Sequence, residues 1–191
     1  MTFPAPPTPL PDPLPRRLNL GCGRRGRDDC LNVDVIPAVE PDLVWDLDRV
    51  PLPLPASWFE RIWVNDVVEH LEDVVSFMTE VHRLLVPGGT IEITTPHFSS
   101  SNAFTDPTHR RQLGYFSFDY FTDASQLSFY SATRFEITRR TLVFRPSRLG
   151  SLVSHMANRY PEAYERRWTW LAPAWFLIFE LTAVKPGHMP P

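Results

Sequence analysis

The chain has 191 residues, of which 43% are hydrophobic and 21% charged, with a formal net charge of −3 and two cysteines. These values exclude a collagen-like, coiled-coil or wholly disordered chain, and two cysteines are too few for a disulfide framework. The small net charge also argues against a nonspecific nucleic-acid binder, and the cysteine content fits a reducing, cytoplasmic setting.

The first fifteen residues contain seven prolines and no basic residue. Because proline cannot join the interior of a helix or sheet, we expect a disordered tail over residues 1–15 that is not a signal peptide. Residues 16–191 are expected to form a single domain. The most apolar stretch, Leu171 to Val184, is interrupted by Pro173 and Glu180 and is shorter than the ~20 residues of a membrane helix, so we expect a buried strand and no membrane span.

Short apolar segments alternate with polar connections along the first half of the chain. The pattern predicts strands over residues 17–20, 31–35, 43–45, 61–64 and 90–95. Apolar residues at helical spacing predict an amphipathic helix over residues 72–85, which Pro87-Gly88-Gly89 terminates. The second half predicts a strand over residues 134–144, helical pieces over 147–167 broken at Pro161, and a strand over 174–185. This order of elements is typical of an α/β protein with a largely parallel sheet.

Polar residues and glycines follow each of the first four predicted strands. In such sheets, ligands bind at the carboxyl ends of the strands, where the strand order reverses. Gly21 and Gly23 let the backbone turn tightly and approach a ligand closely. Asp34 is placed to accept two hydroxyl hydrogen bonds from a ribose, and Asp46 to accept one from an adenine amino group. The sequence therefore predicts a nucleoside site at this edge of the sheet.

A dinucleotide-binding oxidoreductase fits these residues less well. Such a protein needs G-x-G-x-x-G at the start of a helix and an acidic residue about 20 positions further on. Here Arg24-Arg25-Gly26 follows Gly23, and Asp34 comes 11 residues after Gly23. The interval of residues 24–30 is too short and too charged for a phosphate-binding helix. We therefore expect a nucleoside that carries no phosphates.

Five segments within residues 17–96 resemble the motifs of class I S-adenosylmethionine-dependent methyltransferases. They are Leu18–Gly23, Asn32–Asp34, Trp45–Leu47, Asn65–Leu71 and Val81–Gly89. The resemblance implies a Rossmann-like fold with a seven-stranded, mostly parallel sheet, an antiparallel last strand and S-adenosylmethionine as cofactor. The third glycine of the first motif is replaced by Arg25, and the first helix is shortened, as in a compact bacterial and archaeal subgroup.

The resemblance also implies which residues bind the cofactor. They are Leu20, Gly21, Cys22, Gly23, Asp34, Val35, Asp46, Leu47, Asn65, Asp66, Val67 and His70.

Residues 96–133 are expected to form an insertion on the substrate side. Residues 96–111 are polar and follow the fifth predicted strand, at the mouth of the expected pocket. A general base assists methyl transfer only when the acceptor must lose a proton. His97 and His109 are the candidate bases, because both lie in this segment and histidine is a common general base, and Asp106 is a candidate to orient either one. The alternative is that His97, Asp106 and His109 bind a divalent metal, although their spacing matches no metal template, and we predict no metal site.

The sequence thus predicts methyl transfer to oxygen or nitrogen of a small or medium-sized acceptor, such as a sugar, a glycolipid head group or a secondary metabolite. Residues 96–191 hold 7 acidic and 11 basic residues, which leaves room for an anionic acceptor. The alternatives are a catalytically inactive methyltransferase-like protein that binds the nucleoside or a partner protein, and an aminopropyl transferase. The latter needs an acidic polyamine pocket and fits the positive second half less well.

Overall fold

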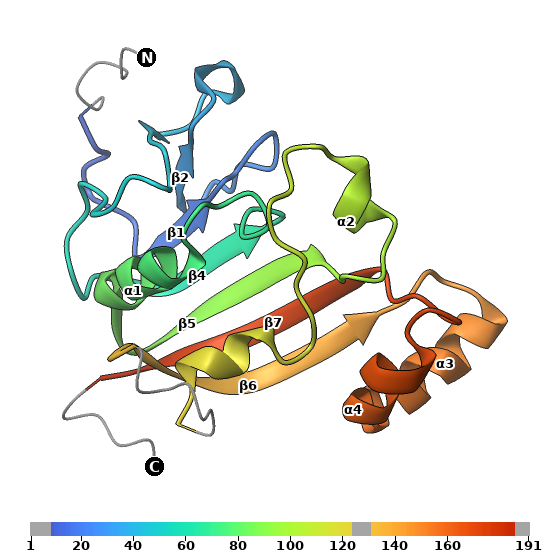
Figure 1. Ribbon diagram of the computed structural model, residues 1–191. Helices are drawn as coiled ribbons and strands as arrows, with labels where there is room; N and C mark the ends of the chain where they lie inside the picture. Colours follow the sequence, from blue (N-terminus) through green and yellow to red (C-terminus); the bar gives the residue numbers. More distant parts are fainter. Residues whose placement is uncertain (1–8, 124–130, 186–191) are drawn as a thin grey trace.

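The computed structural model describes residues 9–123 and 131–185. One seven-stranded sheet runs through the molecule (Figure 1). Its strands are β1 (Arg17–Leu20), β2 (Leu31–Asp34), β3 (Leu43–Val44), β4 (Phe59–Asn65), β5 (Leu85–Pro96), β6 (Arg134–Val143) and β7 (Phe176–Val184). The helical segments are α1 (Val74–Leu84), α2 (Asn102–Thr105), α3 (Arg148–Arg159), α4 (Pro161–Ala163), the 3₁₀ turns η1 (Pro37–Val39) and η2 (Ser117–Phe121), and the π-helical turn η4 (Tyr164–Trp168).

The strand order is β3-β2-β1-β4-β5-β7-β6. Neighbouring strands from β3 to β5 are parallel, and β7 is antiparallel to both β5 and β6. The predicted α/β fold with an antiparallel last strand is confirmed. After β3 the chain returns to the other side of β1, so the order reverses between β1 and β4. This reversal places the expected ligand crevice at the carboxyl ends of these two strands.

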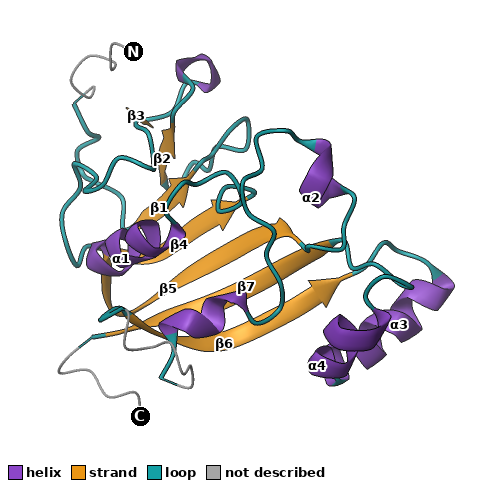
Figure 2. Ribbon diagram, in the orientation of Figure 1, coloured by secondary structure: helices purple, strands orange, loops and turns teal. Residues whose placement is uncertain are grey.

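One face of the sheet carries the apolar core. Ile91 and Ile93 on β5 and Phe179 on β7 are buried side chains on this face. Helix α1 and turn η2 both cover it (Figure 2), and the rings of Phe118 and Phe179 lie 4.7 Å apart. The alternation of buried and half-buried residues along β5 and β7 therefore reflects a sheet with helices packed on one side.

The opposite face carries a polar row that crosses the central strands. Asn19, Trp63, Glu92 and Glu180 are register partners on β1, β4, β5 and β7. Arg61 forms ion pairs with Glu92 (3.1 Å) and Glu180 (3.6 Å). The segment of residues 21–30, whose helix would cover this region in a doubly wound fold, consists of turns and irregular structure. The prediction of a shortened first helix is confirmed. The loop still covers Asn19, whose side-chain amide donates to the carbonyl of Arg25 (3.1 Å), whereas Glu92 and Glu180 are half-buried.

The ends of the central elements differ slightly from the prediction. Helix α1 begins at Val74 because Asp73 is its N-cap residue, with a side chain that accepts a hydrogen bond from the Ser76 amide (2.9 Å). Strand β5 begins at Leu85 instead of residue 90, since Leu85 already pairs with Phe59 before the register shifts. The break at Pro161 between α3 and α4 is confirmed.

The expectation of a disordered tail needs correction for residues 9–15, while residues 1–8 lie outside the described part. Leu10 and Leu14 pack against the core, and Trp58 Nε1 donates a hydrogen bond to the carbonyl of Pro15 (3.0 Å). Proline prevents regular structure here but not apolar packing. Within residues 9–123 and 131–185, no helix is long and apolar enough to cross a membrane.

Candidate functional site

A cavity of about 520 Å³, here called the strand-end cavity, lies where β1, β2 and β4 end. All the predicted cofactor residues except Leu20 line it. Its lining includes Gly21, Cys22, Gly23, Asp34, Val35, Asp46, Leu47, Asn65, Asp66, Val67 and His70, joined by Arg24, Arg25, Ile36, Val39, Asp48 and Leu71. Leu20 is fully buried in the core beneath it. The structure therefore brings together side chains that are up to 50 residues apart in the sequence.

The glycine loop after β1 forms one wall of this cavity. Gly21 and Gly23 have φ values of +66° and +49°, a conformation that glycine adopts without strain. The amides of Gly21 and Cys22 both donate to the carbonyl of Val33 (2.8 and 3.1 Å). A Cβ atom on Gly21 would lie 2.2 Å from Val67 Cγ2, so the loop and the segment after β4 touch only because residue 21 has no side chain.

The carboxylate of Asp34 ties this loop to the end of β2. Its Oδ2 accepts a hydrogen bond from the Gly23 amide (2.7 Å), and its Oδ1 accepts one from the Ile36 amide (2.9 Å). A carboxylate offers about four acceptor sites, so each oxygen keeps capacity for another donor. Asp34 can therefore hold the loop and still accept hydroxyl groups of a ligand.

Arg25, which replaces the third glycine of the motif, has a specific partner at the cavity wall. Its guanidinium forms an ion pair with Asp66 Oδ2 (2.8 Å). Asp66 itself has a φ of +56°, an uncommon conformation for an aspartate outside a turn. This ion pair links the loop after β1 to the segment after β4.

A second cavity of about 510 Å³, here called the histidine cavity, adjoins the first. It is lined by Asp66, Glu69, His70, Pro96, Asn102, Thr105, Asp106, Pro107, His109 and Phe176. Asp66 and His70 line both cavities. The two cavities therefore meet at these two side chains.

Two histidines face each other in the histidine cavity, with ring centroids 4.6 Å apart. His70 Nδ1 is hydrogen-bonded to Thr108 Oγ1 (2.9 Å), and that hydroxyl donates to Asp106 Oδ1 (2.7 Å). His109 Nδ1 is 3.3 Å from the carbonyl of Ala103. Burial, together with the neighbouring His109, lowers the pKa of His70. Asp106 thus orients His70 through the Thr108 hydroxyl, whereas the prediction from the sequence is that it orients His97 or His109.

Glu69 is the most deeply buried acid at this cavity, with 1% of its surface exposed. Its Oε2 accepts a hydrogen bond from Thr95 Oγ1 (3.0 Å), whereas its Oε1 is buried without a hydrogen-bond partner in the described part of the chain. Burial raises the pKa of this carboxyl to about 7. In the sequence, Glu69 is included only within the motif segment Asn65–Leu71 and is not among the predicted site residues. An acid and a histidine next to each other, a few residues after a buried strand, are the signal for this position.

His97 does not join this group. Its side chain is fully buried and lines neither cavity, with Nδ1 bound to Ser99 Oγ (2.7 Å) and Nε2 to Glu165 Oε1 (3.0 Å). Glu165 also accepts the amide of Tyr115. The predicted trio of His97, Asp106 and His109 is therefore divided. His97 connects the end of β5 to turn η4 instead of meeting His109.

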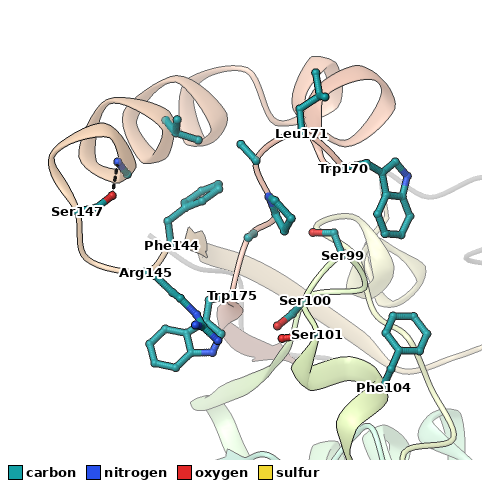
Figure 3. Close-up of a pocket in the computed structure, with 15 residues that line it drawn as sticks. Ser99, Ser100, Ser101, Phe104, Phe144, Arg145, Ser147, Trp170, Leu171 and Trp175 are labelled. Carbon is teal, nitrogen blue, oxygen red and sulfur yellow. Dashed lines mark hydrogen bonds between the residues drawn. The ribbon is translucent and has the colours of Figure 1, made fainter.

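A third cavity of about 680 Å³, here called the serine–tryptophan cavity, lies between α2 and the helices that follow β6 (Figure 3). Ser99, Ser100, Ser101 and Phe104 line one side. Phe144, Arg145, Ser147 and the segment from Trp170 to Trp175 line the other. The Arg145 guanidinium lies 5.5 Å from the Trp175 ring centroid. Residues 170–175 are not predicted as site residues from the sequence, because an apolar segment interrupted by proline resembles ordinary core.

Comparisons with known proteins agree with this architecture. A methyltransferase domain family model matches residues 37–93. No curated protein matches the chain. Among solved structures, an S-adenosylmethionine-dependent methyltransferase from Mesorhizobium loti is similar, with 20% identity, a TM-score of 0.54, and coverage of 91% of this chain and 93% of that one.

Two further solved structures share the fold. A methyltransferase from Archaeoglobus fulgidus has 16% identity and a TM-score of 0.56, with coverage of 88% of this chain and 86% of its own. The YcgJ protein of Bacillus subtilis has 14% identity and a TM-score of 0.57, with coverage of 91% and 93%. The sheet order and the position of the crevice define a class I methyltransferase fold. The family match over residues 37–93 and these structures show that the chain has the fold of S-adenosylmethionine-dependent methyltransferases.

Proposed function

We propose that the protein methylates an oxygen or nitrogen atom of a small or medium-sized polar acceptor bound in the histidine cavity. A sugar, a glycolipid head group or a secondary metabolite has the expected chemistry. The observation that carries this proposal is that Asp66 and His70 line both the strand-end cavity and the histidine cavity. A methyl donor in the first cavity and an acceptor in the second would therefore lie side by side.

The strand-end cavity fits a nucleoside cofactor. The remaining acceptor sites of Asp34 suit the two ribose hydroxyls, and Asp46 at the end of β3 suits an adenine amino group. The positive φ angles of Gly21 and Gly23 leave the backbone accessible. The absence of a helix within residues 21–30 also fits a ligand without a diphosphate.

The acceptor side has to align the nucleophile and, for an alcohol, to assist loss of a proton. S-adenosylmethionine supplies an activated methyl group on a positively charged sulfur. Alignment alone lowers such a barrier by up to ~7–11 kcal/mol. When Nδ1 of His109 donates to the carbonyl of Ala103, the lone pair of the ring is on Nε2. Nε2 of His109 is thus able to accept the proton of an acceptor, and His70 lies beside it in the same cavity.

The serine–tryptophan cavity supports an anionic acceptor. Arg145 is the charged residue in its lining, and its guanidinium lies 5.5 Å from the Trp175 ring centroid. It offers a cationic contact to a carboxylate or phosphate. The free, buried thiols of Cys22 and Cys30 fit the reducing cytoplasm in which we place the enzyme.

The test is calorimetric titration with S-adenosylmethionine and S-adenosylhomocysteine, with NAD as the comparison ligand. We expect micromolar binding of both sulfur nucleosides and none of NAD. Asp34→Asn should weaken binding at least tenfold, about 1.5–3 kcal/mol, because the charge-assisted bonds are lost. Asp28→Asn, an exposed change in the same loop, is the control and should bind like the wild type.

Two results would contradict the proposal. If the Asp34 and Asp28 variants bind the sulfur nucleosides with equal affinity, the ribose does not contact Asp34 at the end of β2. Binding of the cofactor without transfer of a labelled methyl group to any small-molecule extract would favour the alternative of an inactive nucleoside-binding protein.

A further inference from the structure

We infer that Asp66, Glu69, His70 and His109 form a divalent cation site where the two cavities meet, and that this cation binds a hydroxyl-bearing acceptor. The inference rests on the proposed function for its acceptor, but the cation site itself is argued from the side chains alone. These four residues come from two distant segments, the turn after β4 and the loop after α2.

Three of the four residues already have the spacing of a ligand set. One donor atom each from Glu69, His70 and His109 lies within 4.8 Å of the others. Two imidazoles and one carboxylate suit first-row divalent metals such as Mn²⁺, Fe²⁺, Co²⁺ and Zn²⁺. Asp66 lines the same cavity and adds a second carboxylate.

Both carboxylates have an unpaired buried oxygen. Glu69 Oε1 and Asp66 Oδ1 are buried and lack a hydrogen-bond partner in the described part of the chain. Buried polar atoms are otherwise almost always paired, so two such atoms at one cavity require an explanation. In each residue the second oxygen is held, by Thr95 for Glu69 and by Arg25 for Asp66. Each carboxylate is therefore oriented through one oxygen and has the other available to bind a cation.

The two histidines, like the two carboxylates, are each held through one side-chain atom, here Nδ1. His70 Nδ1 is bound to the Thr108 hydroxyl, which donates to Asp106, and His109 Nδ1 lies at the carbonyl of Ala103. With Nδ1 as the donor, the lone pair of each ring is on Nε2. Metal-binding histidines almost always donate their other N–H to such a partner, which fixes the tautomer and the ring orientation.

The backbone keeps the two segments together. The carbonyl of Glu69 accepts the amides of Arg110 (2.8 Å) and Arg111 (3.1 Å). The side chains of both arginines turn away to Glu72, one to its carboxylate and one to its carbonyl. Arg110 and Arg111 therefore bind Glu72 and do not line the histidine cavity. Their backbone amides hold the loop that carries His109 against Glu69.

A cation here would narrow the acceptor class to alcohols, especially those with two neighbouring hydroxyls that can chelate it. A bound divalent ion favours the ionised form of a coordinated hydroxyl, and so it would replace His109 as the means of activating the acceptor. In that reaction the acceptor O–H loses its proton to water. The oxygen forms a bond to the methyl carbon, and the bond from that carbon to sulfur breaks to leave S-adenosylhomocysteine.

The experiment is titration of the full-length, chelator-treated protein with Co²⁺, followed by calorimetry and by the visible absorption of the bound ion. We expect one Co²⁺ per chain. Glu69→Gln and His109→Gln should each weaken binding at least tenfold and change the absorption bands. His155→Gln removes an exposed histidine of α3 and should leave both unchanged. Melting curves check that each variant is folded, and His109→Gln serves as the test if Glu69→Gln is not.

Failure of this inference can be told apart from failure of the proposed function. S-adenosylhomocysteine binding by the metal-free protein tests the cofactor site independently of Co²⁺. If the protein binds the nucleoside but takes up no Co²⁺, or if the His109 and His155 variants bind Co²⁺ equally, the cation site is overturned and the cofactor site remains.

Discussion

The strand-end cavity and the histidine cavity meet at Asp66 and His70, but they are built in different ways. The first is assembled from loops that directly follow β1, β2, β3 and β4, so its position is dictated by sheet topology. The second combines the turn after β4 with α2, the loop after it and the start of β7. Its shape depends on where side-chain and backbone contacts hold a long connection.

Because of this difference, the two cavities differ in how well they tolerate substitutions. The strand-end cavity relies on backbone conformation, above all the positive φ at Gly21, and tolerates few changes. The histidine cavity relies on individual ties, such as the carbonyl of Glu69 accepting two loop amides. A fold of this class can therefore keep its cofactor site and change its acceptor by altering the connection. Three substitutions test whether the two regions are as separable as this.

The largest effect is expected for Gly21→Ala. The new Cβ would lie 2.2 Å from Val67 Cγ2 at a φ of +66°, so both strain and overpacking result. We expect the free energy of unfolding to fall by about 2–4 kcal/mol and cofactor binding to be lost. Gly23→Ala is the matched control, since its φ is +49° but a Cβ there would meet no atom within 4 Å. Gly23→Ala should lower the free energy of unfolding by about 1 kcal/mol.

Urea unfolding and S-adenosylhomocysteine calorimetry measure both quantities for the two variants. Equal losses in the two proteins would show that the contact with Val67 does not close the cavity.

An intermediate effect is expected for His97→Gln. His97 is buried, and its two ring nitrogens are bound to Ser99 and Glu165. Removal of the ring leaves a half-buried carboxylate without this partner, so we expect a loss of about 1–3 kcal/mol in unfolding free energy by urea denaturation. Cofactor affinity should not change, because no residue beyond Leu71 lines the strand-end cavity in the described part of the chain. A stable variant with normal cofactor binding and abolished methyl transfer would restore His97 as the base.

The sequence was sufficient to predict the strand-end cavity because strand order and local motifs place its residues. Asp34 and Asp46 had to lie at one edge once the sheet was parallel. The connections after β5 carry no such constraint. Whether His97 turns toward His109 or toward Glu165 depends on a contact 68 residues away, and neither periodicity nor composition encodes it.

The role of Glu69 is likewise only partly predictable from the sequence. Its place after β4 follows from the sequence, but its unpaired oxygen and its position under the loop of residues 106–111 follow from tertiary contacts. For residues 9–15, the sequence predicts the backbone but not the packing of the side chains. Proline content predicts irregular structure correctly, yet Leu10 and Leu14 find apolar surface to cover.

The smallest effect is expected for His82→Gln. His82 lies on α1 and lines neither the strand-end cavity nor the histidine cavity. Its Nε2 is hydrogen-bonded to the carbonyl of Val184 (2.9 Å), and burial lowers its pKa. The unfolded chain therefore takes up a proton at this residue at a higher pH than the folded chain does. Its contribution to stability is present above the unfolded pKa of about 6.5 and is lost as the pH falls toward the lower folded value.

We accordingly expect the wild type to lose more unfolding free energy than His82→Gln between pH 7.5 and pH 5.5. Urea unfolding at the two pH values measures the difference, and the other histidines cancel because both proteins contain them. Cofactor affinity at pH 7.5 should be the same in both, since His82 is remote from the strand-end cavity. Parallel losses of stability would mean that His82 titrates normally in the folded chain. A change in affinity would mean that α1 and the strand-end cavity are coupled, and the separation of the two regions would then no longer hold.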